Sequence, residues 1–261
     1  MSILDRLAEH ALERVALAKR ARPLSQLRRE ALALPRGTFR FEKALSGPGL
    51  AFICECKRAS PSKGLIAQAF PYLEIARDYE AAGAEAISVL TEPKWFLGRD
   101  EYLEAVARAV SVPCLRKDFT VDPYMLYEAK VLGASAALLI CALTDELRLR
   151  DDLALCEALG LSALVEAHDE GEIDMALRAG ARVIGVNNRN LKDFSVDLDN
   201  SRRLRALIPD GVLFVSESGV RDEADVRAAR AMGADAVLVG EALMRSEDRR
   251  ETLARFREAG A

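Results

Sequence analysis

The sequence predicts an α/β protein, a (β/α)8 TIM barrel with an N-terminal helical extension, and three observations support this. Eight short, almost continuously apolar segments begin near residues 51, 86, 113, 136, 162, 182, 212 and 236. Amphipathic segments separate them, so that the units follow one another every 20–35 residues or so. In six of the eight units a glycine stands between the helical pattern and the strand. Strands that are apolar on both faces are typical of a parallel sheet covered by helices.

Residues 1–49 are predicted to form the helical extension, packed on the barrel. Residues 2–19 and 24–33 have the apolar periodicity of amphipathic helices, and Pro23 and Pro35 punctuate them. No low-complexity linker separates this part from the first strand. We therefore expect one domain that spans residues 1–261.

The barrel strands follow in order along the rest of the chain. The first, LAFICECK at 50–57, and the third, VPCLRK at 112–117, are apolar but lack a preceding glycine. The other six follow helix-ending glycines, the signature of an αβ unit, at Gly83, Gly133, Gly160, Gly180, Gly211 and Gly233. A doubly wound open sheet is the alternative. Against it, no GxGxxG follows the first strand and the chain has no P-loop lysine motif.

Composition and charge argue against several classes of protein. The net charge of −4 is unlike that of a general nucleic-acid binder. No apolar segment approaches the ~18 residues of a membrane span, and the amphipathic N-terminus lacks a signal-peptide core, so we expect a cytoplasmic protein. The two histidines and five cysteines have no metal-ligand spacing, and we expect no bound metal.

Polar residues end several predicted strands, at the edge where such barrels carry their active sites. Because side chains alternate along a strand, those expected to point into the barrel mouth are Glu55, Lys57, Lys117, Glu166 and Asn187. A single strand end often carries solvated charge. Polar ends that converge from several strands on one mouth favour an active site instead.

Lysine usage points to the chemistry of this mouth. The chain has 37 Lys and Arg residues, of which only eight are lysine, yet Lys57 and Lys117 stand at two strand ends. A desolvated lysine can release a proton, whereas an arginine effectively cannot. This usage favours proton transfer or a Schiff base.

The glycine-rich ends of the last two strands favour a phosphate site. Gly219 follows the seventh strand, and Gly240 and Glu241 follow the eighth. Exposed backbone N–H groups at such turns bind phosphate, and barrels often place a phosphate here. The alternative is that both glycines only form tight turns. Together with the lysines and carboxylates, this end predicts acid–base chemistry on a sugar phosphate.

The motifs resemble those of the indole-3-glycerol phosphate synthase family of tryptophan biosynthesis. ECKRASPSKG at 55–64 is similar to the family signature E-x-K-x-x-S-P-S-x-G, and LRKDF at 115–119 is similar to its lysine motif. Further motifs follow in family order: ALLI at 137–140, LVEAHDE at 164–170, GVNNRNL at 185–191, SESG at 216–219 and VLVGEALM at 237–244. The resemblance covers essentially the whole chain, and several motifs in order make it specific.

The resemblance implies a carboxy-lyase that acts without a cofactor. It would convert 1-(2-carboxyphenylamino)-1-deoxyribulose 5-phosphate, whose ring is an anthranilate, to indole-3-glycerol phosphate, carbon dioxide and water. Carried over residue by residue, Lys117 is the general acid, Glu166 the base, and Lys57 the contact of the substrate carboxylate and a second acid. Glu55 would hold Lys57. The other residues implied near the reacting centre are Asn187, Glu217 and Ser218.

The resemblance also implies binding residues. The phosphate would lie on Ser60 and on the backbone of Gly219, Gly240 and Glu241, with Lys57 nearby. Arg189 would orient the substrate. An apolar slot for the anthranilate ring would be formed by Phe96, Phe119, Leu138, Ile140 and Leu191. Arg99 could reach the substrate carboxylate or lie in solvent, and we expect it in solvent. His168 is expected to have a structural role at the turn before Asp169.

Three other functions fit parts of the pattern. A phosphoribosylanthranilate isomerase-type barrel would share the phosphate site, but it usually works with a cysteine and an aspartate. A Schiff-base aldolase would use Lys117 as a nucleophile. A catalytically silent barrel that binds a phosphorylated metabolite or a protein partner would be favoured by lost rim lysines or glutamates, and here all are present.

Overall fold

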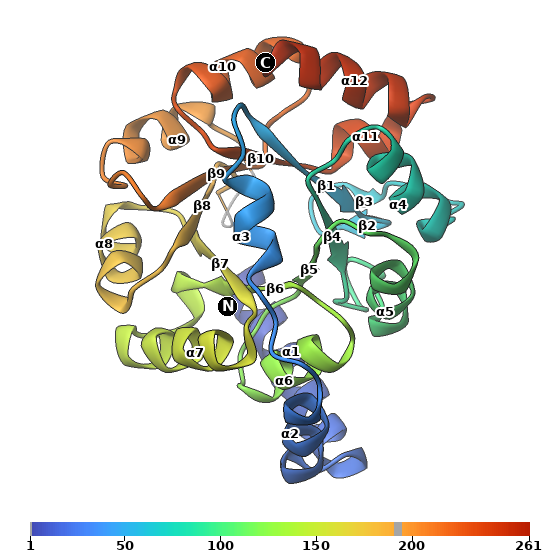
Figure 1. The fold of residues 1–261 in the computed structure, drawn as a ribbon, viewed down its shortest axis with the longest axis vertical. Helices are drawn as coiled ribbons and strands as arrows, with labels where there is room; N and C mark the ends of the chain where they lie inside the picture. Colours follow the sequence, from blue (N-terminus) through green and yellow to red (C-terminus); the bar gives the residue numbers. More distant parts are fainter. Residues whose placement is uncertain (1, 191–194) are drawn as a thin grey trace.

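A closed barrel of eight parallel strands forms the centre of the molecule in a computed structural model, which describes residues 2–190 and 195–261 (Figure 1). The strands are β1 (Ala51–Cys56), β4 (Ala86–Leu90), β5 (Cys114–Lys117), β6 (Ala136–Ile140), β7 (Ser162–Ala167), β8 (Val183–Asn187), β9 (Leu213–Glu217) and β10 (Ala236–Val239). Pairing of β1 with β10 closes the ring. Each strand begins within one residue of its expected start. The prediction of a (β/α)8 barrel is confirmed, and the open doubly wound sheet is wrong.

Helices surround the barrel, as Figure 1 shows. They are α4 (Tyr72–Ala81), α5 (Asp100–Ala109), α6 (Tyr124–Val131), α7 (Glu146–Leu159), α8 (Glu170–Ala179), α9 (Leu198–Arg205), α10 (Glu223–Ala231) and α12 (Arg249–Ala259). A 3-10 helix, η1 (Cys141–Leu143), follows β6, and a short helix, α11 (Glu241–Arg245), follows β10. This ring of helices leaves the ends of the barrel to be covered by other segments.

Two separate apolar clusters show how side chains alternate along the strands. One lies inside the barrel and includes Ile53, Leu115 and Leu164. The other lies between strands and helices and includes Cys54 and Cys56. The inward positions that follow Ile53, Leu115 and Leu164 are two residues further along each strand. The expected orientation is therefore confirmed: the barrel interior is apolar up to its mouth and polar there.

The N-terminal extension consists of α1 (Ile3–Ala21), α2 (Leu24–Ala33) and α3 (Arg40–Leu45). The first two helices correspond to the predicted segments and pack beside α6. The third was not predicted. Its Phe41 and Leu45 are fully buried in the cluster inside the barrel, and Figure 1 shows α3 lying across the ring of strands. Helix α3 thus closes the end of the barrel opposite the polar mouth.

A short hairpin follows β1 and was also not predicted. It consists of β2 (Ala59–Ser60) and β3 (Gly64–Leu65), paired antiparallel. The Ser-Pro-Ser sequence forms its tip, where the backbone N–H of Lys63 donates to the carbonyl of Ser60. The hairpin turns the chain back beside the end of β1. Within the described ranges, no helix is both long and apolar enough to cross a membrane.

Candidate active site

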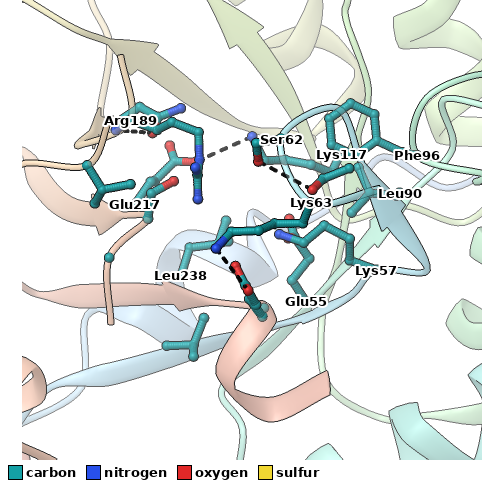
Figure 2. Close-up of a pocket in the computed structure, with 18 of the residues that line it drawn as sticks. Glu55, Lys57, Ser62, Lys63, Leu90, Phe96, Lys117, Arg189, Glu217 and Leu238 are labelled. Carbon is teal, nitrogen blue, oxygen red and sulfur yellow. Dashed lines mark hydrogen bonds and ion pairs between the residues drawn. The ribbon is translucent and has the colours of Figure 1, made fainter. Parts of the chain in front are cut away.

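A pocket of about 880 Å³ opens at the carboxyl ends of the strands (Figure 2). Its wall contains every described residue that the sequence analysis selected for the site: Glu55, Lys57, Ser60, Phe96, Lys117, Phe119, Leu138, Ile140, Glu166, Asn187, Arg189, Glu217, Ser218, Gly219, Gly240 and Glu241. Leu191 lies outside the described residues. Figure 2 shows Arg189 and Glu217 on one side of the pocket and Phe96 and Leu90 on the other. The structure therefore brings the selected residues together, while their chemical roles remain predictions.

The ammonium of Lys117 lies between two carboxylates. Its Nζ is 3.0 Å from Oε2 of Glu166 and 3.4 Å from Oε2 of Glu217. Lys117 ends β5, whereas the two carboxylates come from β7 and β9. Both glutamates are buried, with at most 3% of the side chain exposed. Charges so far from water are stable only when they are paired.

The pKa values of this cluster follow from burial and charge together. Burial by itself would lower the pKa of Lys117, but Glu166 and Glu217 raise it above its ordinary value. Burial raises the pKa of Glu166, but Lys117 and His168 oppose it and lower that pKa to about 2. Burial, with the charge of Glu166, raises the pKa of Glu217 to about 7. At neutral pH the cluster thus holds an ammonium, one firmly ionised carboxylate and one carboxyl group that is close to its titration point.

The second oxygen of Glu166 has partners of its own. Nδ2 of Asn187 donates to Oε1 at 3.1 Å, and Nε2 of His168 lies 3.5 Å from the same atom. The other end of the Asn187 amide accepts from the backbone N–H of Arg189 at 3.0 Å. Asn187 therefore connects the carboxylate to the loop that follows β8.

Lys57 and Glu55 form a second ion pair at the end of β1. Nζ of Lys57 lies 2.6 Å from Oε1 of Glu55, whose side chain is 4% exposed. Gly240, at the end of β10, makes room for this pair. A Cβ built on Gly240 would lie 2.6 Å from Oε1 of Glu55 and 3.0 Å from Nζ of Lys57. The glycine after β10 thus permits close approach of a side-chain pair as well as a turn.

The loops after β9 and β10 form the end of the pocket expected to hold phosphate. Ser218 and Gly219 have consecutive left-handed backbone conformations, with φ of 65° and 105°. The side chain of Glu241 contacts Lys63 at 3.4 Å and Arg245 at 3.1 Å, so that two cations balance its charge. The sequence analysis did not select Lys63, Arg221 or Arg245, which also line the pocket. Nothing in the sequence distinguished these three residues from other basic residues, which are common at loop starts.

The opposite side of the pocket is apolar. The rings of Phe96 and Phe119 lie 5.9 Å apart, and Leu138 and Ile140, which are almost fully buried, line the same pocket. Ile3 and Leu7 of α1 also line the pocket and were missed by the sequence analysis. Their apolar periodicity marked one face of a helix, but nothing local indicated which surface that face would cover.

One other expectation concerns a residue near the mouth. Arg99 is exposed and lines a separate, smaller pocket, which agrees with the expectation that it lies in solvent. Among the described residues, no cluster of three or more His, Cys, Asp or Glu side chains is arranged to hold a metal ion.

The family can now be decided by comparison with known proteins. A family model described as "Indole-3-glycerol phosphate synthase" matches residues 4–256. The chain belongs to this family. The prediction made from the motifs is confirmed, and with it the assignment to a family of carboxy-lyase enzymes.

Individual relatives support the assignment over their whole length. The indole-3-glycerol phosphate synthase of Ruminiclostridium cellulolyticum is 55% identical over 256 residues, which cover 98% of this chain and 98% of that protein. The protein of the same name from Lacticaseibacillus paracasei is 49% identical over 257 residues, covering 98% of this chain and 99% of its own. The similarity therefore includes the N-terminal extension as well as the barrel.

Solved structures with lower identity show the fold alone. A 3-hexulose-6-phosphate synthase from Salmonella typhimurium has a TM-score of 0.65 at 14% identity, over 80% of this chain and 98% of that one. A thiamine phosphate pyrophosphorylase from Pyrococcus furiosus has a TM-score of 0.62 at 17% identity, over 84% of this chain and 96% of that one.

Proposed function

We propose that this chain is an indole-3-glycerol phosphate synthase that converts 1-(2-carboxyphenylamino)-1-deoxyribulose 5-phosphate to indole-3-glycerol phosphate, carbon dioxide and water. The observation that carries the proposal is the position of Lys117, whose ammonium lies between Glu166 and Glu217 at the base of the mouth. An apolar slot and a cation-rich phosphate end flank this cluster. The family membership supports the choice of substrate.

Ring closure is the step that Lys117 would assist. The ring carbon that bears the carboxylate attacks the ketone, a carbon–carbon bond forms, and the ketone oxygen gains negative charge. A buried ammonium next to that oxygen stabilises the charge and supplies the proton. Because Glu166 and Glu217 keep the amine protonated, Lys117 enters the reaction in its acid form.

Decarboxylation and dehydration would use Lys57 and Glu166. Lys57 contacts the substrate carboxylate, which leaves as carbon dioxide while its bonding electrons restore the aromatic ring. Glu166 then takes a proton from the CH2 carbon beside the anilino nitrogen, and the electrons of that C–H bond form the new ring double bond while a lysine protonates the hydroxyl group that leaves as water. Glu55 holds Lys57 in position. These steps are redox-neutral, so no cofactor is proposed.

Substrate orientation would come from both ends of the pocket. The phosphate would bind Ser60 and the backbone N–H groups of Gly219, Gly240 and Glu241, with Lys57 nearby. Arg189 would orient the substrate. The anthranilate ring would lie against Phe96, Phe119, Leu138 and Ile140, and we retain Leu191 as a proposed neighbour. Holding both reacting carbons in one cavity would lower the barrier to ring closure. We expect a cytoplasmic enzyme of one domain, with this small molecule as its partner and no role in nucleic-acid binding.

The test is turnover by purified protein. We expect the absorbance and fluorescence of an indole to appear when the substrate is added in buffer with a chelator and no metal. A flat trace from folded protein would contradict the proposal. Tight substrate binding without turnover would instead favour the catalytically silent barrel. Borohydride inactivation in the presence of substrate would favour the Schiff-base alternative, and turnover of phosphoribosylanthranilate would favour the isomerase.

A further inference from the structure

His168 lies between the proposed base, Glu166, and a second carboxylate, Glu172. Its Nδ1 is 3.2 Å from Oε2 of Glu172, and its Nε2 is 3.5 Å from Oε1 of Glu166. The side chain is 19% exposed. Nε2 is itself buried and has no hydrogen-bond partner within the described part of the chain. The geometry therefore places an unsatisfied ring nitrogen opposite the catalytic carboxylate.

The local backbone fixes the imidazole in this place. His168 is the first residue after β7, and Asp169 caps α8 by accepting from the backbone N–H of Glu172 at 2.9 Å. Glu172 reaches back, and its Oε2 accepts from the backbone N–H of His168 at 2.7 Å. Nδ2 of Asn200, from α9, donates to the carbonyl of His168 at 3.2 Å. These contacts agree with the structural role expected from the sequence, but none of them involves Nε2.

The hydrogen bond between Nδ1 and Glu172 restricts the protonation state of Nε2. An ionised carboxylate only accepts, so Nδ1 must carry a proton to bond Glu172. Nε2 then either carries a second proton, which makes the ring an imidazolium, or turns a lone pair toward Oε1 of Glu166. The second arrangement is repulsive while Glu166 is ionised. The imidazolium therefore suits a site in which Glu166 is to act as a base.

The charged groups around the ring agree with this state. Glu166 acts on it from β7, Glu172 from the start of α8 and Glu217 from β9, and the capping residue Asp169 is its neighbour in the chain. Burial lowers the pKa of His168, but hydrogen bonding to Glu172 and the charge of Glu166 raise it above its ordinary value. On η1, Cys141 remains a neutral thiol, because burial raises its pKa to about 12. From β5, Lys117 contacts the other oxygen of Glu166.

We propose that His168, oriented by Glu172, is a positioning residue for the reaction: its imidazolium donates from Nε2 to Oε1 of Glu166 and holds that carboxylate ionised and aligned with Lys117. The inference rests on the role of Glu166 given under the proposed function. The 3.5 Å separation suits a contact that shortens when substrate fills the pocket, as catalytic hydrogen bonds often do. When His168 loses its proton, Glu166 loses a donor and faces a lone pair.

The first experiment compares turnover and its pH dependence in His168→Gln and His10→Gln. Glutamine keeps an amide donor but no charge, and His10 is the only other histidine in the chain. We expect His168→Gln to lower kcat about 10-fold, less than the ~100-fold or more of a lost general acid or base because Glu166 itself remains, and to change KM less than about 2-fold. In wild type, kcat falls as pH rises through the pKa of His168. This inflection is absent in His168→Gln and unchanged in His10→Gln.

The second experiment measures the imidazole directly by NMR titration. His10→Gln leaves one histidine, so the remaining signal belongs to His168. In that background, Glu166→Gln and Glu172→Gln each remove one carboxylate and should each lower the pKa of His168. The kcat inflection should move to lower pH in Glu172→Gln by the same amount.

The two experiments separate this inference from the proposed function. A wild-type protein without turnover would contradict the function, and the NMR titration would still test the contact. A His168 pKa that does not change in Glu166→Gln would overturn the inference. So would a folded His168→Gln variant that keeps the wild-type kcat and pH profile. If that variant does not fold, Glu172→Gln decides, because an unmoved inflection there also overturns the inference.

Discussion

The carboxylate of Glu217 occupies the space where a side chain at position 185 would lie, and Gly185 has none. A Cβ built on Gly185 would lie 2.0 Å from Oε1 of Glu217. The two residues come from neighbouring strands, β8 and β9, and the side chain of Glu217 lines the barrel mouth. The glycine therefore allows the second carboxylate to lie inside the barrel, next to Lys117. A methyl group at position 185 could be accommodated only if the carboxylate of Glu217 moved.

Gly185→Ala should still fold and lose turnover. The methyl group meets the buried Glu217 carboxylate and lies 3.1 Å from a methyl of Leu164, so the unfolding free energy should fall by about 1–3 kcal/mol, the usual cost of overpacking. The displaced carboxylate of Glu217 would weaken its contact with Lys117 and lower kcat about 10-fold or more. Chemical denaturation and steady-state kinetics measure the two effects. Gly47→Ala is the matched control, because a Cβ there meets nothing within 4 Å, and equal kinetics in both variants would contradict the prediction.

Glu217→Gln should change how stability depends on pH. The pKa of Glu217 is about 7 in the folded protein and 4.5 for the free side chain, so the folded state binds the proton more tightly. The stabilising contribution of this carboxyl is therefore fully present below pH 4.5 and is lost as pH rises through 7. Relative to Glu217→Gln, the wild-type unfolding free energy should fall between about pH 5 and pH 8. Parallel pH curves for the two proteins would refute the assignment.

Gly240→Ala should separate Lys57 from Glu55. Its Cβ would lie 2.6 Å from Oε1 of Glu55, so the ion pair must move or the turn after β10 must shift. Because this turn is also the proposed phosphate site, we expect KM to rise about 10-fold, the effect of losing about 1.4 kcal/mol of binding. Gly47→Ala again serves as the control. An unaltered KM in a folded Gly240→Ala protein would remove this turn from the binding site.

Arg14 anchors α1 to the residue that follows the catalytic lysine candidate. Its guanidinium makes a bidentate contact with Asp118, at 2.6 and 3.0 Å, and the carboxylate is fully buried. Burial raises the pKa of Asp118, but Arg14 lowers it below its ordinary value. Arg14→Met should reduce the unfolding free energy by about 3 kcal/mol, the low end for a broken buried pair, because Thr91 still donates to Asp118.

The same substitution should weaken substrate binding, since α1 carries Ile3 and Leu7 to the pocket. Arg20→Met on the exposed side of α1 is the control, with an expected stability change within about 0.5 kcal/mol. Equal stability of the two variants would show that the contact does not anchor the helix. The Arg14 contribution should also be lost as pH falls through the lowered pKa of Asp118.

The strands and most of the candidate site could be predicted from the sequence because both have local signatures. An apolar run after a glycine marks a strand, and alternation then assigns Glu55, Lys117 and Glu166 to one mouth. The barrel geometry completes the site, because parallel strands bring all their carboxyl ends to the same edge. The motifs of the family supplied the roles that spacing alone left open.

The features that were missed depend on contacts between distant segments. Phe41 and Leu45 of α3 fill the bottom of the barrel, but in the sequence they are two apolar residues in a short charged segment. Ile3 and Leu7 reach the pocket because Arg14 pairs with Asp118, 104 residues away. His168 was assigned to a turn, and its neighbour Glu166 gave no indication of the direction of Nε2. Such pairings leave no periodic signal in the chain.

The most direct test of the account is the kcat of Lys117→Ala with the carboxyphenylamino-deoxyribulose phosphate, measured beside wild type and Lys43→Ala. Lys43 is an exposed lysine of α3, at the opposite end of the barrel. The account predicts a folded Lys117→Ala protein whose turnover is at least ~100-fold lower, as expected for a lost general acid, and a Lys43→Ala protein with wild-type turnover. Wild-type turnover in Lys117→Ala would contradict it.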